Sequence, residues 1–299
     1  MRQHTGDMNK AGKQKQGVYD MSIHFGMPTL IECPSLKQSL SLCSELGLDF
    51  VELNMNLPEY QLDRINIGEA KRLFRHYDKY PTIHLDENLN VCDFNSAIAE
   101  AYSNTVIRAI SLAKEIGAPI INMHISEGVY FSLPESRTYL FAQYKDEYLD
   151  KLRQFRDRCE AELYDSDILI CIENCDTFRD FQCEGIDLLL ESPCFALTYD
   201  IGHDFCTGNG NEAFILSRAD RLKHMHIHDA AGARNHLTLG TGELDIDAKL
   251  ALAQKYDCRC VVETKTAAAL RQSVVYLADH KKPIESIEHP HPFKFYVNS

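Results

Sequence analysis

The stretch LTYDIGHDF, residues 197–205, places an aspartate and a histidine directly after a short apolar run. A short apolar run bounded by turn signals is typical of a buried strand. Such a strand ordinarily ends in a turn without ionisable side chains. This run instead ends at Asp200, and His203 follows three residues later. Whether other apolar runs end in the same way therefore decides both the fold and the kind of site.

Eight apolar runs of strand length recur along the chain. They are MSIHFGMP (21–28), LDFVELNM (48–55), YPTIHL (80–85), APIINMHIS (118–126), DILICIEN (167–174), CFALTYDIG (194–202), LKHMHIHD (222–229) and CRCVVETK (258–265). Helical spacing of apolar residues marks segments between them, namely SLKQSLSLCSELG (35–47), NSAIAEAYSNTVIRAISLAKEIG (95–117) and ESRTYLFAQYKDEYLDKLRQFRDRCEAELYDS (135–166). Gly47 and Gly117 stand where the C-terminal caps of two helices are expected.

Strands that alternate with helices favour parallel pairing, and eight such repeats match a closed (β/α)8 barrel, typically of about 250 residues. A doubly wound open sheet is the alternative, but no glycine-rich dinucleotide fingerprint follows the first strand. We therefore expect an α/β fold with a single TIM barrel domain over residues 21–299. Residues 1–20 are expected to be a flexible polar leader.

The composition narrows the class of protein. The chain has 299 residues, of which 44% are hydrophobic and 25% charged, and no apolar run approaches the roughly 20 residues that span a bilayer. The leader lacks the apolar segment of a secretory signal, so we expect a cytoplasmic protein. Eleven cysteines without a CxxC pair indicate buried thiols rather than disulfides or a zinc finger. The net charge of −13 disfavours nucleic-acid binding unless one face is locally basic.

The carboxyl ends of barrel strands meet at one rim, where active sites lie. Seven of the eight runs bring an ionisable side chain near that end: Glu52, His84, His124, Glu173, Asp200 with His203, His226 with His228, and Glu263. Carboxylates and imidazoles are costly to bury together unless positive charge lies among them. A divalent metal ion would supply that charge.

The last four strands offer three carboxylates and one imidazole, a set that suits Mn²⁺, Zn²⁺, Co²⁺ or Mg²⁺ better than a thiolate-binding metal. The predicted ligands are Glu173, Asp200, His226 and Glu263. His224 and His228 share a strand face with His226. We expect the deeper His224 to be a hydrogen-bonded core histidine, whereas His228 either supports a ligand or is structural. Asn122 and His124 should share the inward face of the fourth strand.

The loop AAGARNHLTLGTGELD (230–245) contains three glycines and can fold tightly over the rim. Its Arg234 would clamp a phosphate or a sugar hydroxyl, because a guanidinium offers a planar fork of donors. An ordinary surface arginine is the alternative. Lys265, two residues after Glu263, is a further candidate for binding an anion.

The segments TIHLDE, INMHIS, CIENC, YDIGHDF, MHIHDAAGARNHLTLGTGELD and VVETK resemble the sugar phosphate isomerase/epimerase family. The fold of that family is the xylose isomerase-like barrel, and its superfamily includes zinc-dependent abasic-site endonucleases. The resemblance covers nearly the whole chain after residue 20. It implies that the four predicted ligands bind the metal, that Glu173 and Glu263 exchange protons with the substrate, and that His203 contacts it. His84, His124 and His236 match ligands of the endonucleases' multi-zinc cluster.

Two departures from these relatives concern the loop. The endonucleases carry an Asp-x-His pair where this chain reads Arg234, Asn235 and His236, so a cation replaces a ligand carboxylate. The substrate-binding arginine of the ketose epimerases, six residues after the metal-binding histidine, falls here on Gly232. Arg234 would take that role only if the loop runs differently.

We therefore expect a metal-dependent isomerase or epimerase acting on a sugar, sugar phosphate or related polyol ketone. It would abstract a proton alpha to a carbonyl and pass through a metal-stabilised enediolate. The expected substrate-binding residues are His84, His124, His203, Arg234 and His236. The alternatives are an abasic-site endonuclease, an inosose-type dehydratase and a metal-free sugar-binding or regulatory barrel.

The expected partner is the small sugar, not nucleic acid or a membrane. The C-terminal stretch EHPHPFKFYVNS (288–299) would pack either across a second subunit of a homo-oligomer or on the barrel's own wall.

Overall fold

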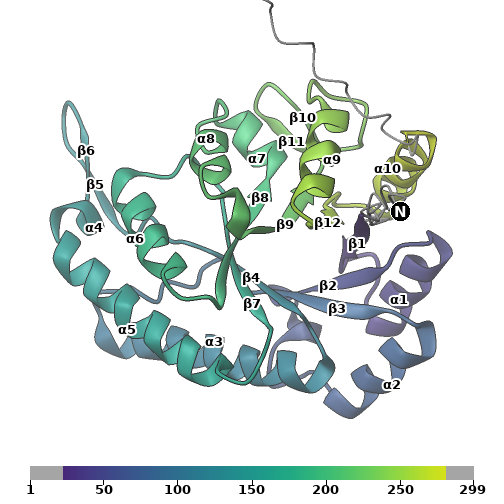
Figure 1. The fold of residues 1–299 in the computed structure, drawn as a ribbon, viewed down its shortest axis with the longest axis horizontal. Coiled ribbons are helices and arrows are strands. Elements are labelled where there is room, and N and C mark those ends of the chain that lie inside the picture. The colour runs from purple at the N-terminus through teal and green to yellow at the C-terminus, as the bar shows by residue number, and fades with distance from the viewer. Residues whose placement is uncertain (1–22, 281–299) are drawn as a thin grey trace, which may run out of the picture.

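The computed structural model describes residues 23–280, which form a closed barrel of parallel strands (Figure 1). The barrel strands are β1 (His24–Pro28), β2 (Phe50–Asn54), β3 (Tyr80–His84), β4 (Ile120–His124), β7 (Leu169–Glu173), β8 (Phe195–Asp200), β9 (Leu222–Ile227) and β12 (Arg259–Val262). They follow one another in that order, and β12 pairs with β1 to close the barrel. The predicted (β/α)8 fold is confirmed. The predicted leader and the C-terminal stretch 288–299 lie outside the described residues.

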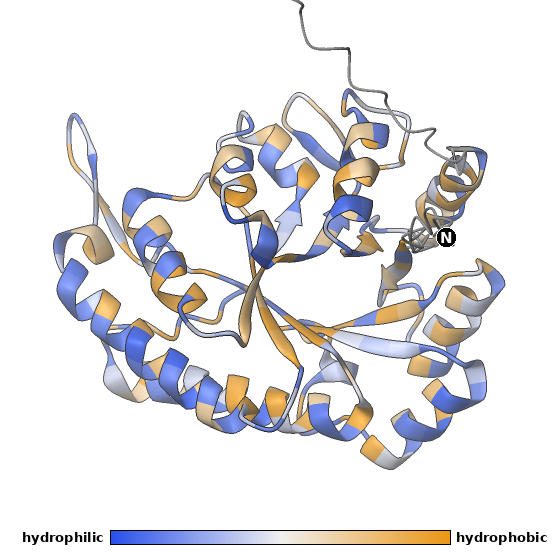
Figure 2. Cartoon of the chain, in the orientation of Figure 1, coloured by the Kyte–Doolittle hydropathy of each residue, from blue (hydrophilic) through white to orange (hydrophobic). Residues whose placement is uncertain are grey.

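Helices surround the barrel in the view of Figure 1. They are α1 (Leu36–Glu45), α2 (Ile67–Tyr77), α3 (Ser96–Ile116), α4 (Leu140–Gln143), α5 (Lys145–Leu163), α6 (Asp180–Leu190), α7 (Ile201–Cys206), α8 (Glu212–Leu216), α9 (Ile246–Lys255) and α10 (Ala267–His280), with short 3-10 turns η1 (Pro58–Tyr60) and η2 (Ala219–Arg221). Figure 2 shows apolar residues concentrated in the strands and polar residues on much of the helices. Within residues 23–280, none of the helices has the length and apolar character needed to cross a bilayer.

The helix ends follow from local side-chain chemistry. Asn66 accepts a hydrogen bond from the Glu69 N–H at 2.9 Å and thereby caps the first turn of α2. At the other end, Gly47 and Gly117 follow α1 and α3 with φ angles of 65° and 77°. These left-handed conformations carry little steric cost in glycine, so the two predicted glycine caps are confirmed.

Two antiparallel hairpins stand outside the barrel, and neither was predicted. One joins β5 (Tyr130–Ser132) to β6 (Arg137–Tyr139) and projects away from the barrel in Figure 1. The expectation that 135–166 is helical from its start was therefore wrong, because β6 precedes α4 and α5 there. Threonine and tyrosine in β6 pair across to aromatic residues of β5, which favours a strand. The other hairpin, β10 (Asp229–Ala231) with β11 (Arg234–Leu237), lies after β9.

The barrel interior changes from apolar to polar along the strands. Ile120, Cys171 and Ala196 form a small buried cluster towards the amino ends of their strands. Two residues further along each strand, on the same face, come Asn122, Glu173 and Thr198, all buried. The period of two thus places polar side chains together towards the carboxyl ends of the strands. A functional site is expected at that end.

Candidate active site

The stretch 197–205 ends a strand, begins a helix and supplies two site residues. Asp200 is the last residue of β8 and the N-cap of α7, where its Oδ1 accepts the His203 N–H at 2.7 Å. This cap explains the three-residue spacing of aspartate and histidine. Gly202 between them packs against His228, because a Cβ at this position would lie 2.0 Å from that ring. A larger residue would therefore displace either the helix or His228.

The structure brings the four predicted ligands together. One ligand atom from each of Glu173, Asp200, His226 and Glu263 lies within 4.8 Å of the others. His226 Nδ1 lies 3.0 Å from Glu173 Oε1, 3.4 Å from Glu263 Oε2 and 3.9 Å from Asp200 Oδ2. All four side chains are buried. We call these four residues the quartet.

The quartet has the chemistry of a divalent metal site. Three carboxylates buried side by side repel one another and lose their hydration, at an effective cost of several kcal/mol per ion, unless a positive charge lies among them. Among the described residues, His226 Nδ1 and Glu263 Oε2 are buried atoms without a hydrogen-bond partner. Atoms in this state are available as ligands. The donor set of oxygens with one imidazole fits a divalent cation of the harder kind.

The two glutamates of the quartet are ionised. Burial raises the pKa of Glu173, but the neighbouring His226 and His124 lower it by more, so that the net pKa lies well below its ordinary value. Glu263 behaves in the same way, with His226 and Lys265 opposing the effect of burial on its pKa. Lys265 Nζ lies 2.9 Å from Glu263 Oε1. Both carboxylates can therefore bind a cation or accept a proton.

Glu52 was expected at the rim but lies beneath the quartet, fully buried in β2. Its Oε2 accepts hydrogen bonds from Thr82 Oγ1 and His224 Nε2, each at 2.9 Å. The prediction that His224 is a hydrogen-bonded core histidine is thus confirmed. Glu52 Oε1 lies 3.0 Å from His226 Nε2, on the far side of that ring from the quartet carboxylates. A carboxylate in this position orients a ligand histidine.

His84 and His124 lie beside the second oxygen of Glu173. Their Nε2 atoms are 3.3 Å and 3.2 Å from Glu173 Oε2, so the three residues could also hold a metal ion. Burial lowers the pKa of His84, but the carboxylates of Glu173 and Glu52 together raise it by more, to about 9. Asn122 also donates to Glu173 Oε2 and accepts from Thr198 Oγ1 at 2.5 Å. Three side chains, His84, His124 and Asn122, therefore contact this oxygen of Glu173.

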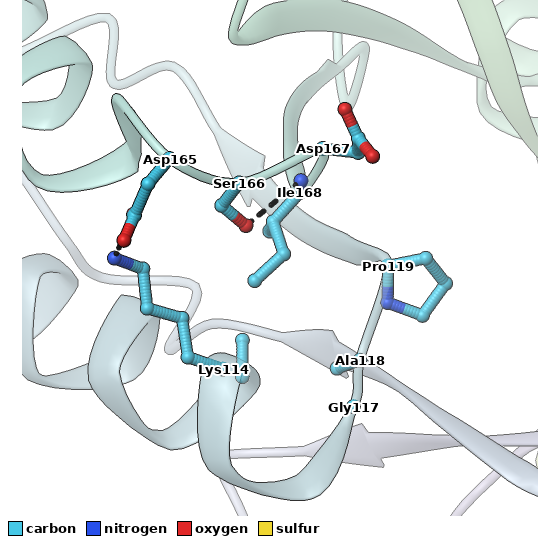
Figure 3. Close-up of a pocket in the computed structure, with 9 residues that line it drawn as sticks. Lys114, Gly117, Ala118, Pro119, Asp165, Ser166, Asp167 and Ile168 are labelled. Atoms are coloured by element: carbon cyan, nitrogen blue, oxygen red, sulfur yellow. Dashed lines mark hydrogen bonds and ion pairs between the residues drawn. The ribbon is translucent and has the colours of Figure 1, made fainter.

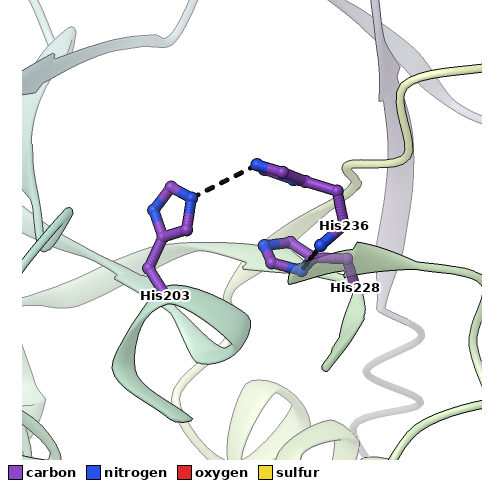
Figure 4. A group of neighbouring side chains, drawn as sticks. All are labelled: His203, His228 and His236. Carbon is purple, nitrogen blue, oxygen red and sulfur yellow. Dashed lines mark hydrogen bonds between the residues drawn. The ribbon is translucent and has the colours of Figure 1, made fainter. Parts of the chain in front are cut away.

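His203, His228 and His236 form a second cluster (Figure 4). It adjoins the quartet, since His236 Nδ1 lies 3.7 Å from Glu263 Oε2. His236 Nδ1 lies 3.1 Å from the Glu263 carbonyl, which can only accept, so this nitrogen carries the proton. His236 Nε2 then accepts from His203 Nε2 at 3.3 Å. Burial lowers the pKa of His236 to about 4, which keeps this ring neutral. Arg234 is exposed at the start of β11.

A cavity of about 160 Å³ opens beside the quartet and is lined by His124, Glu173, Glu87, Glu127 and Asp176, among others. Four of its ten lining residues are acidic. A larger hollow of about 320 Å³ lies at the opposite end of the barrel, between the residues that precede β4 and those that precede β7 (Figure 3). None of the predicted site residues lines that hollow. The rim cavity is therefore the candidate active site.

The residues that hold the ligands were only partly predicted. Asn174 directly follows Glu173 and bonds to the backbone of Asp200, and Thr198 supports Asn122. Neither was identified as a site residue. The sequence signal that could have identified them is a polar residue inside an apolar run close to a predicted ligand. Asn174 directly follows Glu173, and Thr198 lies two positions before Asp200.

A closed barrel whose carboxyl rim gathers acidic and imidazole groups around one point belongs to the TIM barrels with a catalytic rim. The model of the family described as the xylose isomerase-like TIM barrel matches residues 40–282. The chain belongs to this family. A search of curated proteins found no significant match.

Solved structures share the fold at low sequence identity. A D-tagatose 3-epimerase-like protein is 23% identical, with a TM-score of 0.68 over 87% of this chain and 99% of that one. The apo 3-keto-D-glucoside 4-epimerase YcjR from E. coli is 16% identical, with a TM-score of 0.68 over 86% and 100%. The IolI protein with a bound zinc atom is 17% identical, with a TM-score of 0.65 over 86% and 97%. At these identities the likeness establishes the fold.

Proposed function

We propose that this protein is a metal-dependent isomerase or epimerase of a sugar or a related polyol ketone. The observation that carries the proposal is the quartet itself, in which carboxylate oxygens of Glu173 and Glu263 lie 3.0 Å and 3.4 Å from one imidazole nitrogen of His226. Sugar epimerases and the zinc-containing IolI protein share the fold, which supports this choice of chemistry.

Glu173, Asp200, His226 and Glu263 would hold the metal. When bound, a divalent ion acts as a Lewis acid that offsets negative charge developing on the substrate oxygens. One of the two glutamates removes the proton alpha to the substrate carbonyl. In an epimerisation the other glutamate, after taking a proton from water, gives it to the opposite face of the same carbon, and the first glutamate releases the abstracted proton to water. In an isomerisation the first glutamate returns the abstracted proton to the adjacent carbon. His203 donates to His236 and would be within reach to hold a substrate hydroxyl in place.

The charge of the cavity favours a neutral sugar over a sugar phosphate. Glu87 and Asp176 line it and would repel a phosphate dianion. Two nearby cations already pair with carboxylates, since Arg179 lies 3.2 Å from Glu127 Oε2 and Lys265 pairs with Glu263. We therefore propose that the substrate carries no phosphate.

The test is proton exchange between deuterated water and a panel of free sugars and their phosphates, with the protein loaded in turn with Mn²⁺, Zn²⁺, Co²⁺ or Mg²⁺. The proposal predicts exchange with at least one neutral ketose and faster exchange than with its phosphate. Glu173→Gln and Asp200→Asn should lose both metal and exchange. Absence of exchange with every sugar in the metal-loaded protein contradicts the proposal.

One observation favours a second function, cleavage of DNA at abasic sites. His84 and His124 beside Glu173 would suit an additional metal ion. The net charge of −13 and the acidic cavity oppose it. Cleavage of a duplex with one abasic site would establish this activity. Product analysis of the sugar panel separates an isomerase from a dehydratase, because only the latter releases water from the substrate.

A further inference from the structure

His228 is fully buried between Asp200 and the hairpin of β10 and β11. Its Nδ1 receives a hydrogen bond from the His236 backbone N–H at 2.8 Å (Figure 4). The Asp229 carbonyl lies further from the same nitrogen, at 3.3 Å. A backbone N–H can only donate, so Nδ1 presents its lone pair to the nearer group, the His236 N–H. The ring proton therefore sits on Nε2, which lies 3.1 Å from Asp200 Oδ1 and 3.2 Å from Oδ2. The Asp200 carboxylate can accept the hydrogen bond that this Nε2–H donates.

We propose that His228 is a positioning residue, which donates from Nε2 to Asp200 and thereby couples the hairpin of β10 and β11 to the metal site. This inference rests on the proposed function, because it assigns Asp200 as a ligand. Gly202, two residues after Asp200, leaves room for the His228 ring. A Cβ at residue 202 would lie 2.0 Å from that ring.

The same contacts argue that His203, His228 and His236 do not bind a second cation together, although their nitrogens lie close enough. A metal ligand needs a free lone pair. On His228 the Nδ1 lone pair accepts the His236 N–H and Nε2 donates its proton to Asp200, so this ring has no free lone pair for a metal ion. The cluster is thus a chain of hydrogen bonds that runs from His203 to the His236 ring and from the His236 backbone to His228.

Two substitutions separate the two bonds of His228. In His228→Asn the side-chain oxygen can replace Nδ1 as the acceptor for His236, but no donor reaches Asp200. In His228→Gln the amide can replace Nε2 as the donor to Asp200, but the acceptor for His236 is lost. Thermal unfolding of both variants checks that each is folded.

The first measurement is Zn²⁺ affinity of the full chain in competition with a chromophoric chelator. Loss of a residue that orients a ligand costs about 10–100-fold in metal affinity. We expect that loss in His228→Asn and an affinity close to wild type in His228→Gln. The second measurement is tryptic cleavage after Arg234 in the hairpin, which should accelerate in His228→Gln and stay slow in His228→Asn.

The third measurement is the nitrogen NMR spectrum of histidine-labelled wild-type protein, with His228→Asn assigning the signals. We expect a protonated Nε2 and an unprotonated Nδ1 on His228. A protonated Nδ1, or equal Zn²⁺ affinity in wild type and His228→Asn, overturns the inference. Failure of the wild-type protein to bind any metal contradicts the proposed function instead, and the NMR spectrum still decides where the His228 proton lies.

Discussion

The side chain of Asn174 makes two hydrogen bonds to the backbone of Asp200. Its Nδ2 donates to the Asp200 carbonyl and its Oδ1 accepts the Asp200 N–H, each at 2.9 Å. Both residues are buried, so water cannot replace these bonds. Asn174 therefore fixes the backbone that carries a quartet carboxylate.

Asn174→Ala should destabilise the protein and loosen the metal site together. Each buried backbone group left unpaired costs about 1–3 kcal/mol in the free energy of unfolding. We expect a loss of that order in urea unfolding, together with weaker Zn²⁺ binding. Asn104→Ala is the control, because Asn104 is exposed and accepts from Arg158 far from the rim. Equal stability of the two variants contradicts the role of Asn174.

Glu263→Gln should slow proton transfer strongly while keeping the size of the side chain. A positioned acid or base contributes about 10²–10⁴-fold to the rate. We expect the deuterium exchange rate to fall by this factor at saturating metal. Glu87→Gln is the matched control, since Glu87 lines the cavity but is outside the quartet. An exchange rate in Glu263→Gln equal to that of the control removes Glu263 from the mechanism.

Gly202→Ala should disturb the contact between α7 and His228. The added methyl group would lie 2.0 Å from the buried ring, and forcing extra volume into a packed core costs about 1–3 kcal/mol. Gly68→Ala is the control, because the nearest atoms to a Cβ there are 3.6 Å away. We expect reduced stability only in Gly202→Ala, measured by chemical unfolding. Equal unfolding free energies would show that α7 can shift without loss.

Bound metal should stabilise the folded protein, since it offsets the repulsion among three buried carboxylates. A ligand at 100 times its Kd adds about 2.7 kcal/mol to the free energy of unfolding. We expect the Tm to rise with added Zn²⁺ and to fall with a chelator. Asp200→Asn should show a much smaller rise. A Tm that changes neither with added Zn²⁺ nor with the chelator contradicts a metal site in the quartet.

The barrel and the positions of the quartet could be predicted from the sequence because both depend on simple periods. Strands of apolar residues alternate with helices, and the last residues of strands such as β7 and β8 share one rim. The short hairpins could not be predicted in this way. In β6 only three residues pair, too few for a period, and the helical spacing downstream extended the predicted helix over them.

The supporting contacts escaped prediction for a different reason. Glu52 was placed at the rim by its position in the run, but it lies beneath the quartet because β2 continues for two residues beyond it. The bonds of Asn174 and His228 depend on where backbone groups of other strands lie in space. A single sequence does not carry that information.

The most direct measurement is the metal content of the purified full-length protein after dialysis, compared with that of Asp200→Asn. The proposed site predicts one tightly held divalent ion per chain in the wild type and its loss in the variant. Wild-type protein that retains no ion after loading, or a variant that retains the same ion equally well, contradicts it.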